Sequence, residues 1–221
     1  AGIGKATAKL FADEGAKVVM VDLKRAALEE AAKELGLQED QYELVEADVS
    51  KESEVEKYVK QAKEKFGRID IFFNNAGIEG EVHTIVEQPA ENIERVLDVN
   101  IKGVLFGLKH VMREMIAQKS GSIINMSSVG GWMGSPGMAP YVASKHAVIG
   151  ITKSAALEVA GFGIRVNTIS PGPIETRMMR SIEAGSAPGQ GDAAKQAVIN
   201  SMPLKRYGLP EEVAQLVLFL A

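Results

Sequence analysis

The sequence contains no cysteine, which excludes disulfide bonds, thiolate nucleophiles and cysteine-held metal centres. Neither charge dominates, because 25 Lys and Arg residues stand against 29 Asp and Glu, and no basic stripe marks a nucleic-acid partner. No apolar run approaches the ~18 residues that a membrane helix needs, and no signal-peptide pattern is present. We therefore expect a soluble, cytoplasmic protein without nucleic-acid or membrane partners.

Two further kinds of site are missing from the sequence. The three histidines, His83, His110 and His146, are far apart and have no metal-ligand spacing, so we expect no metal. There is also no Gly-x-Ser-x-Gly motif, which excludes an α/β-hydrolase.

Short apolar segments alternate with longer segments of helical periodicity along the whole chain. Strands are predicted at 17–22, 42–49, 69–73, 122–126 and 164–169, and helices at 6–14, 24–35, 51–66, 89–117, 140–161 and after Pro210. Such alternation indicates βαβ units and a parallel sheet covered on both faces. The apolar fraction of 46% is ordinary for a globular protein, and no change in composition marks a second domain. The sequence therefore predicts one α/β domain with a doubly wound parallel sheet.

Glycines and an acidic residue at the start of the chain indicate a dinucleotide site. Gly2-Ile3-Gly4 opens the first helix, where glycine lets the backbone approach a pyrophosphate at the unpaired N–H groups, although a tight turn has the same pattern. Asp22 ends the next strand, about twenty residues later, where a carboxylate accepts hydrogen bonds from an adenosine ribose or caps the following helix.

Polar and small residues follow two further predicted strands. Asp48-Val49 follows the second, and Asp48 can accept a hydrogen bond from an adenine amino group or compete with Ser50 as a helix cap. Asn75-Ala76-Gly77 follows the third, and its small residues allow a flat ring to come close. Each motif alone fits both interpretations.

Tyr141 and Lys145 lie four residues apart on a predicted helix, which places both side chains on one face. A cation near a phenol lowers its pKa, and such a phenol exchanges protons with an alcohol or a ketone. A chance pair on a solvated face is the alternative. Ser127-Ser128 at a strand end and Asn100 inside an apolar helix favour the functional interpretation.

Taken together, these motifs resemble the short-chain dehydrogenase/reductase (SDR) family, in family order and at family spacing over nearly the whole chain. The matching segments are Gly2-Ile3-Gly4, Asp48-Val49, Asn74-Asn75-Ala76-Gly77, Asn100, Ser128, Tyr141-Val142-Ala143-Ser144-Lys145, Asn167 and Pro171-Gly172. The resemblance implies a Rossmann-type fold and a single NAD(P)-binding domain over residues 1–221.

The same resemblance implies that the domain is incomplete at both ends. The family's Thr-Gly and first strand would precede Gly2, and a closing strand would follow residue 221. The first strand is central in this fold, so we expect a slot or a collapsed sheet between the strands at 17–22 and 69–73, and poor stability.

The family's catalytic roles carry over to four residues. Tyr141 is the implied general acid/base, and Lys145 lowers its pKa and holds the nicotinamide ribose. Ser128, preferred over Ser127 on spacing, binds the substrate oxygen, and Asn100 anchors a water in a proton relay. Pro171 and Gly172 also belong to the implied cofactor site, and Ile174 and Thr176 resemble residues that hold the nicotinamide carboxamide.

These residues predict an NAD-dependent alcohol dehydrogenase or ketone reductase; a non-catalytic dinucleotide-binding sensor or scaffold is the alternative. NADP is less favoured, because Asp22 repels a 2′-phosphate and because Ala1 and Leu23 stand where NADP-preferring members carry a basic residue. Lys24 and Arg25 lie close enough to leave that preference open.

The expected substrate is a modest hydroxyl-bearing or cyclic molecule. The segments that should frame it, 78–89, 129–140 and 175–203, are mostly small and apolar. The helices at 89–117 and 140–161 carry more apolar surface than the sheet would cover, so we expect a homo-oligomer. The family resemblance implies a tetramer.

Overall fold

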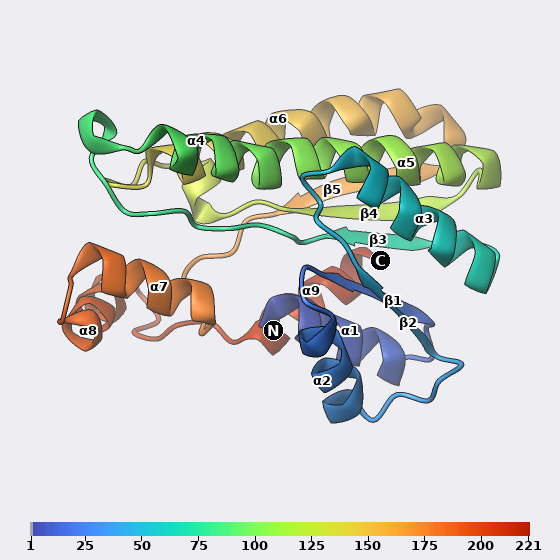
Figure 1. Ribbon diagram of the computed structural model, residues 1–221, viewed down its shortest axis with the longest axis horizontal. Helices are drawn as coiled ribbons and strands as arrows, with labels where there is room; N and C mark the ends of the chain where they lie inside the picture. Colours follow the sequence, from blue (N-terminus) through green and yellow to red (C-terminus); the bar gives the residue numbers. More distant parts are fainter. Residues whose placement is uncertain (1) are drawn as a thin grey trace.

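Two parallel sheets form the centre of the computed structural model, which describes residues 2–221 (Figure 1). In the first sheet β1 (Val18–Asp22) pairs with β2 (Tyr42–Glu46), with Val18 opposite Tyr42. In the second, β4 (Gly121–Met126) lies between β3 (Ile71–Asn74) and β5 (Ile164–Ile169). Every pairing is parallel, as the alternation of strands and helices predicts.

Helices connect these strands and cover both faces of the sheets. They are α1 (Ile3–Asp13), α2 (Arg25–Leu35), α3 (Glu52–Phe66), α4 (Ala90–Leu97), α5 (Gly103–Gln118), α6 (Ala139–Val159), α7 (Arg177–Ser186), α8 (Gly191–Ser201) and α9 (Pro210–Leu220). None of those in residues 2–221 is long and apolar enough to cross a membrane.

The apolar core lies in layers on the two sides of β3–β5. On one side α3, α5 and α6 pack on the sheet around Val111, Ile123 and Val148, each at most 1% exposed. On the other side α9 packs under Ile124 and Met126, and α1 lies beside α9 (Figure 1). The predicted doubly wound α/β architecture is confirmed.

Two predicted elements differ from the structure, and one segment without a predicted element forms helices. The expected helix 89–117 is interrupted by a π-helical turn at Asp98–Lys102, which inserts one extra residue between α4 and α5. The expected strand 42–49 ends at Glu46. The segment 174–202, without a clear pattern in the sequence, forms α7 and α8.

The two sheets are not hydrogen-bonded to each other in the described part of the chain. β1 and β3 instead line a shared cavity, with Val19 and Val21 on one side and Ile71 and Phe73 on the other. Of the two outcomes that we expected, a slot or a collapsed sheet, the structure has the slot. The expected loss of stability stays a prediction.

Candidate functional site

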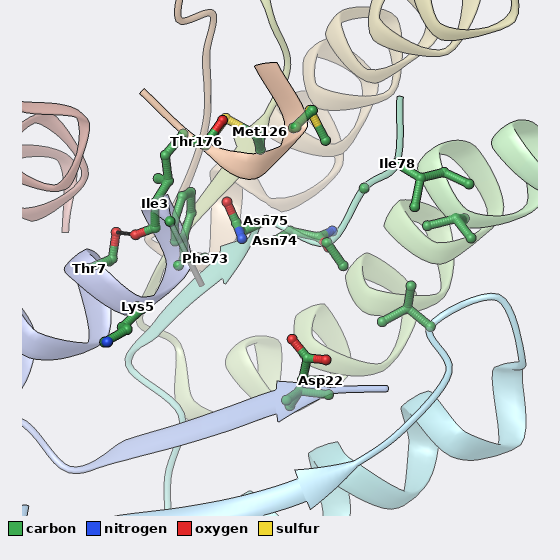
Figure 2. Close-up of a pocket in the computed structure, with 18 of the residues that line it drawn as sticks. Ile3, Lys5, Thr7, Asp22, Phe73, Asn74, Asn75, Ile78, Met126 and Thr176 are labelled. Atoms are coloured by element: carbon green, nitrogen blue, oxygen red, sulfur yellow. Dashed lines mark hydrogen bonds between the residues drawn. The ribbon is translucent and has the colours of Figure 1, made fainter. Parts of the chain in front are cut away.

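One cavity of about 1810 Å³ runs along the carboxyl ends of the strands and continues into the slot. Its lining includes every predicted site residue except Asn100: Gly2, Ile3, Gly4, Asp22, Asp48, Val49, Asn75, Ala76, Gly77, Ser128, Tyr141, Lys145, Pro171, Gly172, Ile174 and Thr176. Figure 2 shows Asp22 at the end of β1 and Thr176 on the opposite side of the cavity. The fold thus brings together residues that lie more than 170 positions apart in the chain, from Gly2 to Thr176.

The N-terminus of α1 forms one wall of this cavity. Gly2 has φ +66°, a conformation that favours glycine, and no side chain caps the helix, so the first-turn N–H groups are open. A Cβ on Gly2 would lie 3.3 Å from Thr176 Cγ2, and a Cβ on Gly4 would lie 2.9 Å from Asn75 Nδ2. The two glycines therefore let three distant segments converge where an anion binds well.

The acidic residues at the ends of β1 and β2 have different surroundings. Asp22 is exposed and accepts only the backbone N–H of Lys24, at 3.3 Å, among the hydrogen bonds of the described residues. Asp48 accepts both the backbone N–H and the hydroxyl of Ser50, at 3.0 and 2.7 Å. Burial acts to raise the pKa of Asp48, but these hydrogen bonds and Lys51 outweigh it and keep that pKa below its ordinary value.

Asp48 and Ser50 do not cap the next helix. Lys51 is the N-cap of α3, and no side chain accepts a hydrogen bond there. Val49 instead packs against Gly103, where a Cβ would lie 2.9 Å from Val49 Cγ2. This contact brings the loop after β2 against the start of α5.

The two adjacent serines face different ways. Ser127 is 2% exposed, and its hydroxyl donates to the Lys145 carbonyl at 2.9 Å. Ser128 lines the cavity, and its Oγ accepts the Gly130 N–H at 3.1 Å. Ser127 is therefore part of the packing between β4 and α6, whereas the Ser128 hydroxyl lies in the cavity beside Tyr141.

Tyr141 and Lys145 lie on one face of α6, with the Lys145 Nζ 5.5 Å from the centre of the tyrosine ring. Lys145 is 3% exposed and donates to the Met126 carbonyl at 2.9 Å. Burial lowers the pKa of Lys145 to about 8.

The pKa of Tyr141 lies above its ordinary value in this structure, and the lowering by Lys145 stays a prediction. Burial raises the pKa of Tyr141, the hydrogen bond with Ser128 opposes that rise, and the charge of Glu79 adds to it. The Lys145 ammonium group donates to the Met126 carbonyl in this arrangement.

Asn100 lies behind the cavity wall, in the π-helical turn, and is fully buried. Its Oδ1 accepts the Ile78 N–H at 2.8 Å, while its Nδ2 donates to the Ile78 carbonyl at 2.9 Å and to Ser144 Oγ at 3.0 Å. Both amide hydrogens are thereby used, so the side chain has no donor left for a water. The predicted water relay would need another group of this residue.

The sequence interpretation missed Glu79. This residue is 8% exposed, and its carboxylate pairs with Arg177 from α7, which lines the cavity. An isolated acidic residue in a loop carries no pattern, so no signal in the sequence identifies it. Ala1, which entered the cofactor argument, lies outside the described residues.

Comparisons with known proteins agree with this site. The family model described as "Enoyl-(Acyl carrier protein) reductase" matches residues 1–221. Levodione reductase of Leifsonia aquatica is 41% identical over 99% of this chain and 83% of its own length. A 3-oxoacyl-(acyl-carrier-protein) reductase of Thermotoga maritima is 43% identical over 100% of this chain and 86% of its length.

Solved structures give the same result. The crystal structure of levodione reductase superposes with a TM-score of 0.96 at 40% identity, covering 99% of this chain and 86% of that one. The structure of NAD⁺-bound xylitol dehydrogenase superposes with a TM-score of 0.91 at 36% identity, covering 99% and 87%.

The burial of Lys145 predicts a specific pH dependence of stability. Because its pKa is about 8 in the folded protein and 10.5 ordinarily, the unfolded chain binds more protons between these values. The contribution of Lys145 to the free energy of unfolding should therefore rise with pH across that window and be constant below it. Urea unfolding of the unmodified protein and of Lys145→Met should diverge there as pH rises.

Lys153→Met provides the matched control, because Lys153 is an exposed lysine on the same helix. It should leave the pH dependence unchanged. Parallel curves for the unmodified protein and Lys145→Met would contradict the lowered pKa.

Proposed function

Because the chain belongs to the short-chain dehydrogenase/reductase family, we propose that it interconverts a secondary alcohol and a ketone with NAD. The observation that supports this most is that Ser128, Tyr141 and Lys145 line the same cavity as the open N-terminus of α1. A dinucleotide-binding sensor would need the helix end and Asp22, but not a hydroxyl, a phenol and an ammonium group beside them.

The residues of the cavity fit a dinucleotide. A Cβ at Gly4 would fill the space over Asn75, and a Cβ at Gly77 would lie 3.4 Å from Lys145 Nζ, so these glycines keep a cradle open. We assign the pyrophosphate to the α1 N-terminus, the adenosine to Asp22, Asp48 and Val49, and the nicotinamide end to the remaining lining residues, which are Asn75, Ala76, Gly77, Lys145, Pro171, Gly172, Ile174 and Thr176.

A bound nicotinamide supplies or accepts the hydride. Tyr141 takes the hydroxyl proton during alcohol oxidation and returns it during ketone reduction. Ser128 donates its hydroxyl hydrogen to the substrate oxygen in place of its hydrogen bond with Tyr141, while its Oγ keeps accepting the Gly130 N–H. Rotation of Lys145 from the Met126 carbonyl towards the phenol would favour the phenolate, since a nearby cation lowers a phenol's pKa.

Tyr141→Phe keeps the ring but removes the proton that is transferred. The kcat should fall by about 10²–10⁴-fold, while NADH binding, followed by fluorescence titration, should persist. Tyr42→Phe removes a hydroxyl from β2, outside the cavity, and should leave kcat unchanged. Near-normal turnover by Tyr141→Phe would contradict the mechanism.

The preference for NAD over NADP is argued from the end of β1. Asp22 is exposed there and would repel a 2′-phosphate. Arg25 donates to Glu29 and to the Leu44 carbonyl, at 2.9 and 2.7 Å, and is therefore held against β2. Of the two cations that closely follow Asp22 in the sequence, this leaves Lys24 to oppose its charge.

The double variant Asp22→Ala/Leu23→Arg should shift the preference towards NADP, because it removes a repulsive charge and adds a phosphate partner. The measurement is kcat/KM with each cofactor. Leu23→Arg alone is the control and should shift the ratio less, since Asp22 still opposes the phosphate. An unmodified protein that already prefers NADP would contradict the role of Asp22.

We also propose a homotetramer built on α5 and α6, which form the top layer in Figure 1. On this outer surface Leu157 is 83% exposed and Leu105 is 45% exposed. A Cβ on Gly150 of α6 would meet no other atom within 4 Å outside its own helix backbone, so this part of the helix faces open space. A monomer rarely exposes a large apolar patch.

Leu157→Glu should weaken this association without unfolding the protein, because an exposed position tolerates charge in the monomer. Light scattering at micromolar concentration should show a tetramer for the unmodified protein and smaller species for the variant. Val86→Glu, at a 92% exposed position in the loop before α4, is the control. A monomeric unmodified protein would contradict the proposal.

A further inference from the structure

Asp48, which lines the cavity after β2, has one carboxylate oxygen that is open to a ligand. Both hydrogen bonds from Ser50 go to Oδ1, at 3.0 and 2.7 Å. Oδ2 accepts no hydrogen bond within residues 2–221 and has the Lys51 Nζ at 3.9 Å. The backbone N–H of Asp48 donates to Glu54 at 2.7 Å, which fixes the position of the residue. A flat ring with an amino group on its edge can therefore donate to Oδ2.

The helix that passes this loop carries Arg95 towards the same part of the cavity. Val49 packs against Gly103 at the start of α5, where a Cβ would lie 2.9 Å from Val49 Cγ2. Val99 and Arg95 come one and two helical turns before Gly103, and both line the cavity. Burial acts to raise the pKa of Asp48, and the charge of Arg95 is among the causes that lower it, so the two groups lie near each other.

The guanidinium group of Arg95 has no protein partner in the described part of the chain. Arg95 is exposed, and none of the ion pairs or side-chain hydrogen bonds within residues 2–221 involves its side chain, not even with Glu91 one turn earlier on α4. By contrast, Lys102 on the following turns is paired with Asp98 at 2.6 Å. A guanidinium group is planar and weakly hydrated, so it stacks well on a flat heteroaromatic ring.

The surroundings of the open carboxylate oxygen suit a base better than a phosphate. Leu23 follows β1 where Asp48 follows β2, and these strands pair up to Asp22 and Glu46. Leu23 is 57% exposed and lines the cavity, as Val99 does. Apolar side chains fit the faces of a base and the carboxylate fits its amino edge, whereas a carboxylate repels a phosphate.

We propose that Arg95 is a cofactor-binding residue whose guanidinium group stacks on the adenine ring, while the adenine amino group donates to Asp48 Oδ2. The inference rests on the proposed function, because it concerns the dinucleotide of the same cavity. Arg95 then contributes to the affinity for the cofactor and takes no part in proton transfer at Tyr141.

The test measures equilibrium binding to the full chain. ADP-ribose, which has the adenosine but no nicotinamide, is titrated by calorimetry, and NADH by fluorescence. Arg95→Met keeps the length of the side chain but removes the planar cation, so it should weaken the binding of both ligands by about 5-fold or more. Arg95→Lys keeps the charge without the plane and should restore little of this affinity.

Two further ligands separate the contacts that the proposal names. Reduced nicotinamide hypoxanthine dinucleotide has an oxygen in place of the adenine amino group, so it should bind the unmodified protein more weakly than NADH, because Asp48 accepts hydrogen bonds only. NADPH adds the 2′-phosphate. If Arg95 stacks on the ring, Arg95→Met should weaken NADPH and NADH by the same factor.

Arg113→Met is the matched control. Arg113 is an exposed arginine on α5 and is not part of the cavity lining. Its replacement removes the same charge from the protein as Arg95→Met does, and it should leave the binding of ADP-ribose and NADH unchanged.

The possible failures are distinguishable. Undiminished binding of ADP-ribose by Arg95→Met, full recovery in Arg95→Lys, or a loss confined to NADPH would overturn the inference and leave the proposed function standing. An unmodified protein that binds neither ADP-ribose nor NADH would overturn the dinucleotide site and the proposed function with it.

Discussion

The side-chain amide of Asn100 is the interaction on which the site depends. It joins the loop after β3, the π-helical turn before α5 and the N-terminal part of α6, and it is fully buried. Removal of this amide would leave the two backbone groups of Ile78 and the Ser144 hydroxyl without this hydrogen-bond partner inside the protein. Each buried polar group that loses its partner lowers the free energy of unfolding by about 1–3 kcal/mol. The extra residue of the π turn is what turns this amide inward from an otherwise apolar helix.

Charge burial is the second organising feature. Lys145 and Glu79 are both nearly buried, and the charge of Glu79 acts to raise the pKa of Tyr141. In this structure burial of the phenol is the main cause of that raised pKa, and the Lys145 ammonium group donates to the Met126 carbonyl.

Much of this arrangement could be predicted from the sequence because it depends on local patterns. The apolar strands, the glycines before α1 and the four-residue spacing of Tyr141 and Lys145 each define a geometry by themselves, and parallel strands place their carboxyl ends at one edge. The family resemblance supplied the roles of Ser128 and Asn100.

The remainder depends on contacts between distant segments. The orientation of Ser127 is set by the Lys145 carbonyl, and the pairing of Glu79 with Arg177 joins residues 98 positions apart. The sequence does not reveal the π-helical turn either, because its apolar periodicity differs from that of an α-helix by a single residue. The direction of the Tyr141 pKa shift depends mainly on the burial of the phenol, which the spacing of Tyr141 and Lys145 does not give.

The cavity between the two sheets has a mechanical consequence. Asp22 belongs to the β1–β2 half, whereas Tyr141 and Thr176 belong to the other, and the described strands of the two halves share no ladder hydrogen bonds. A dinucleotide that binds at both ends of the cavity would contact both halves and link them. Binding would then stabilise the two halves against separation. The melting temperature should therefore rise with the concentration of the ligand.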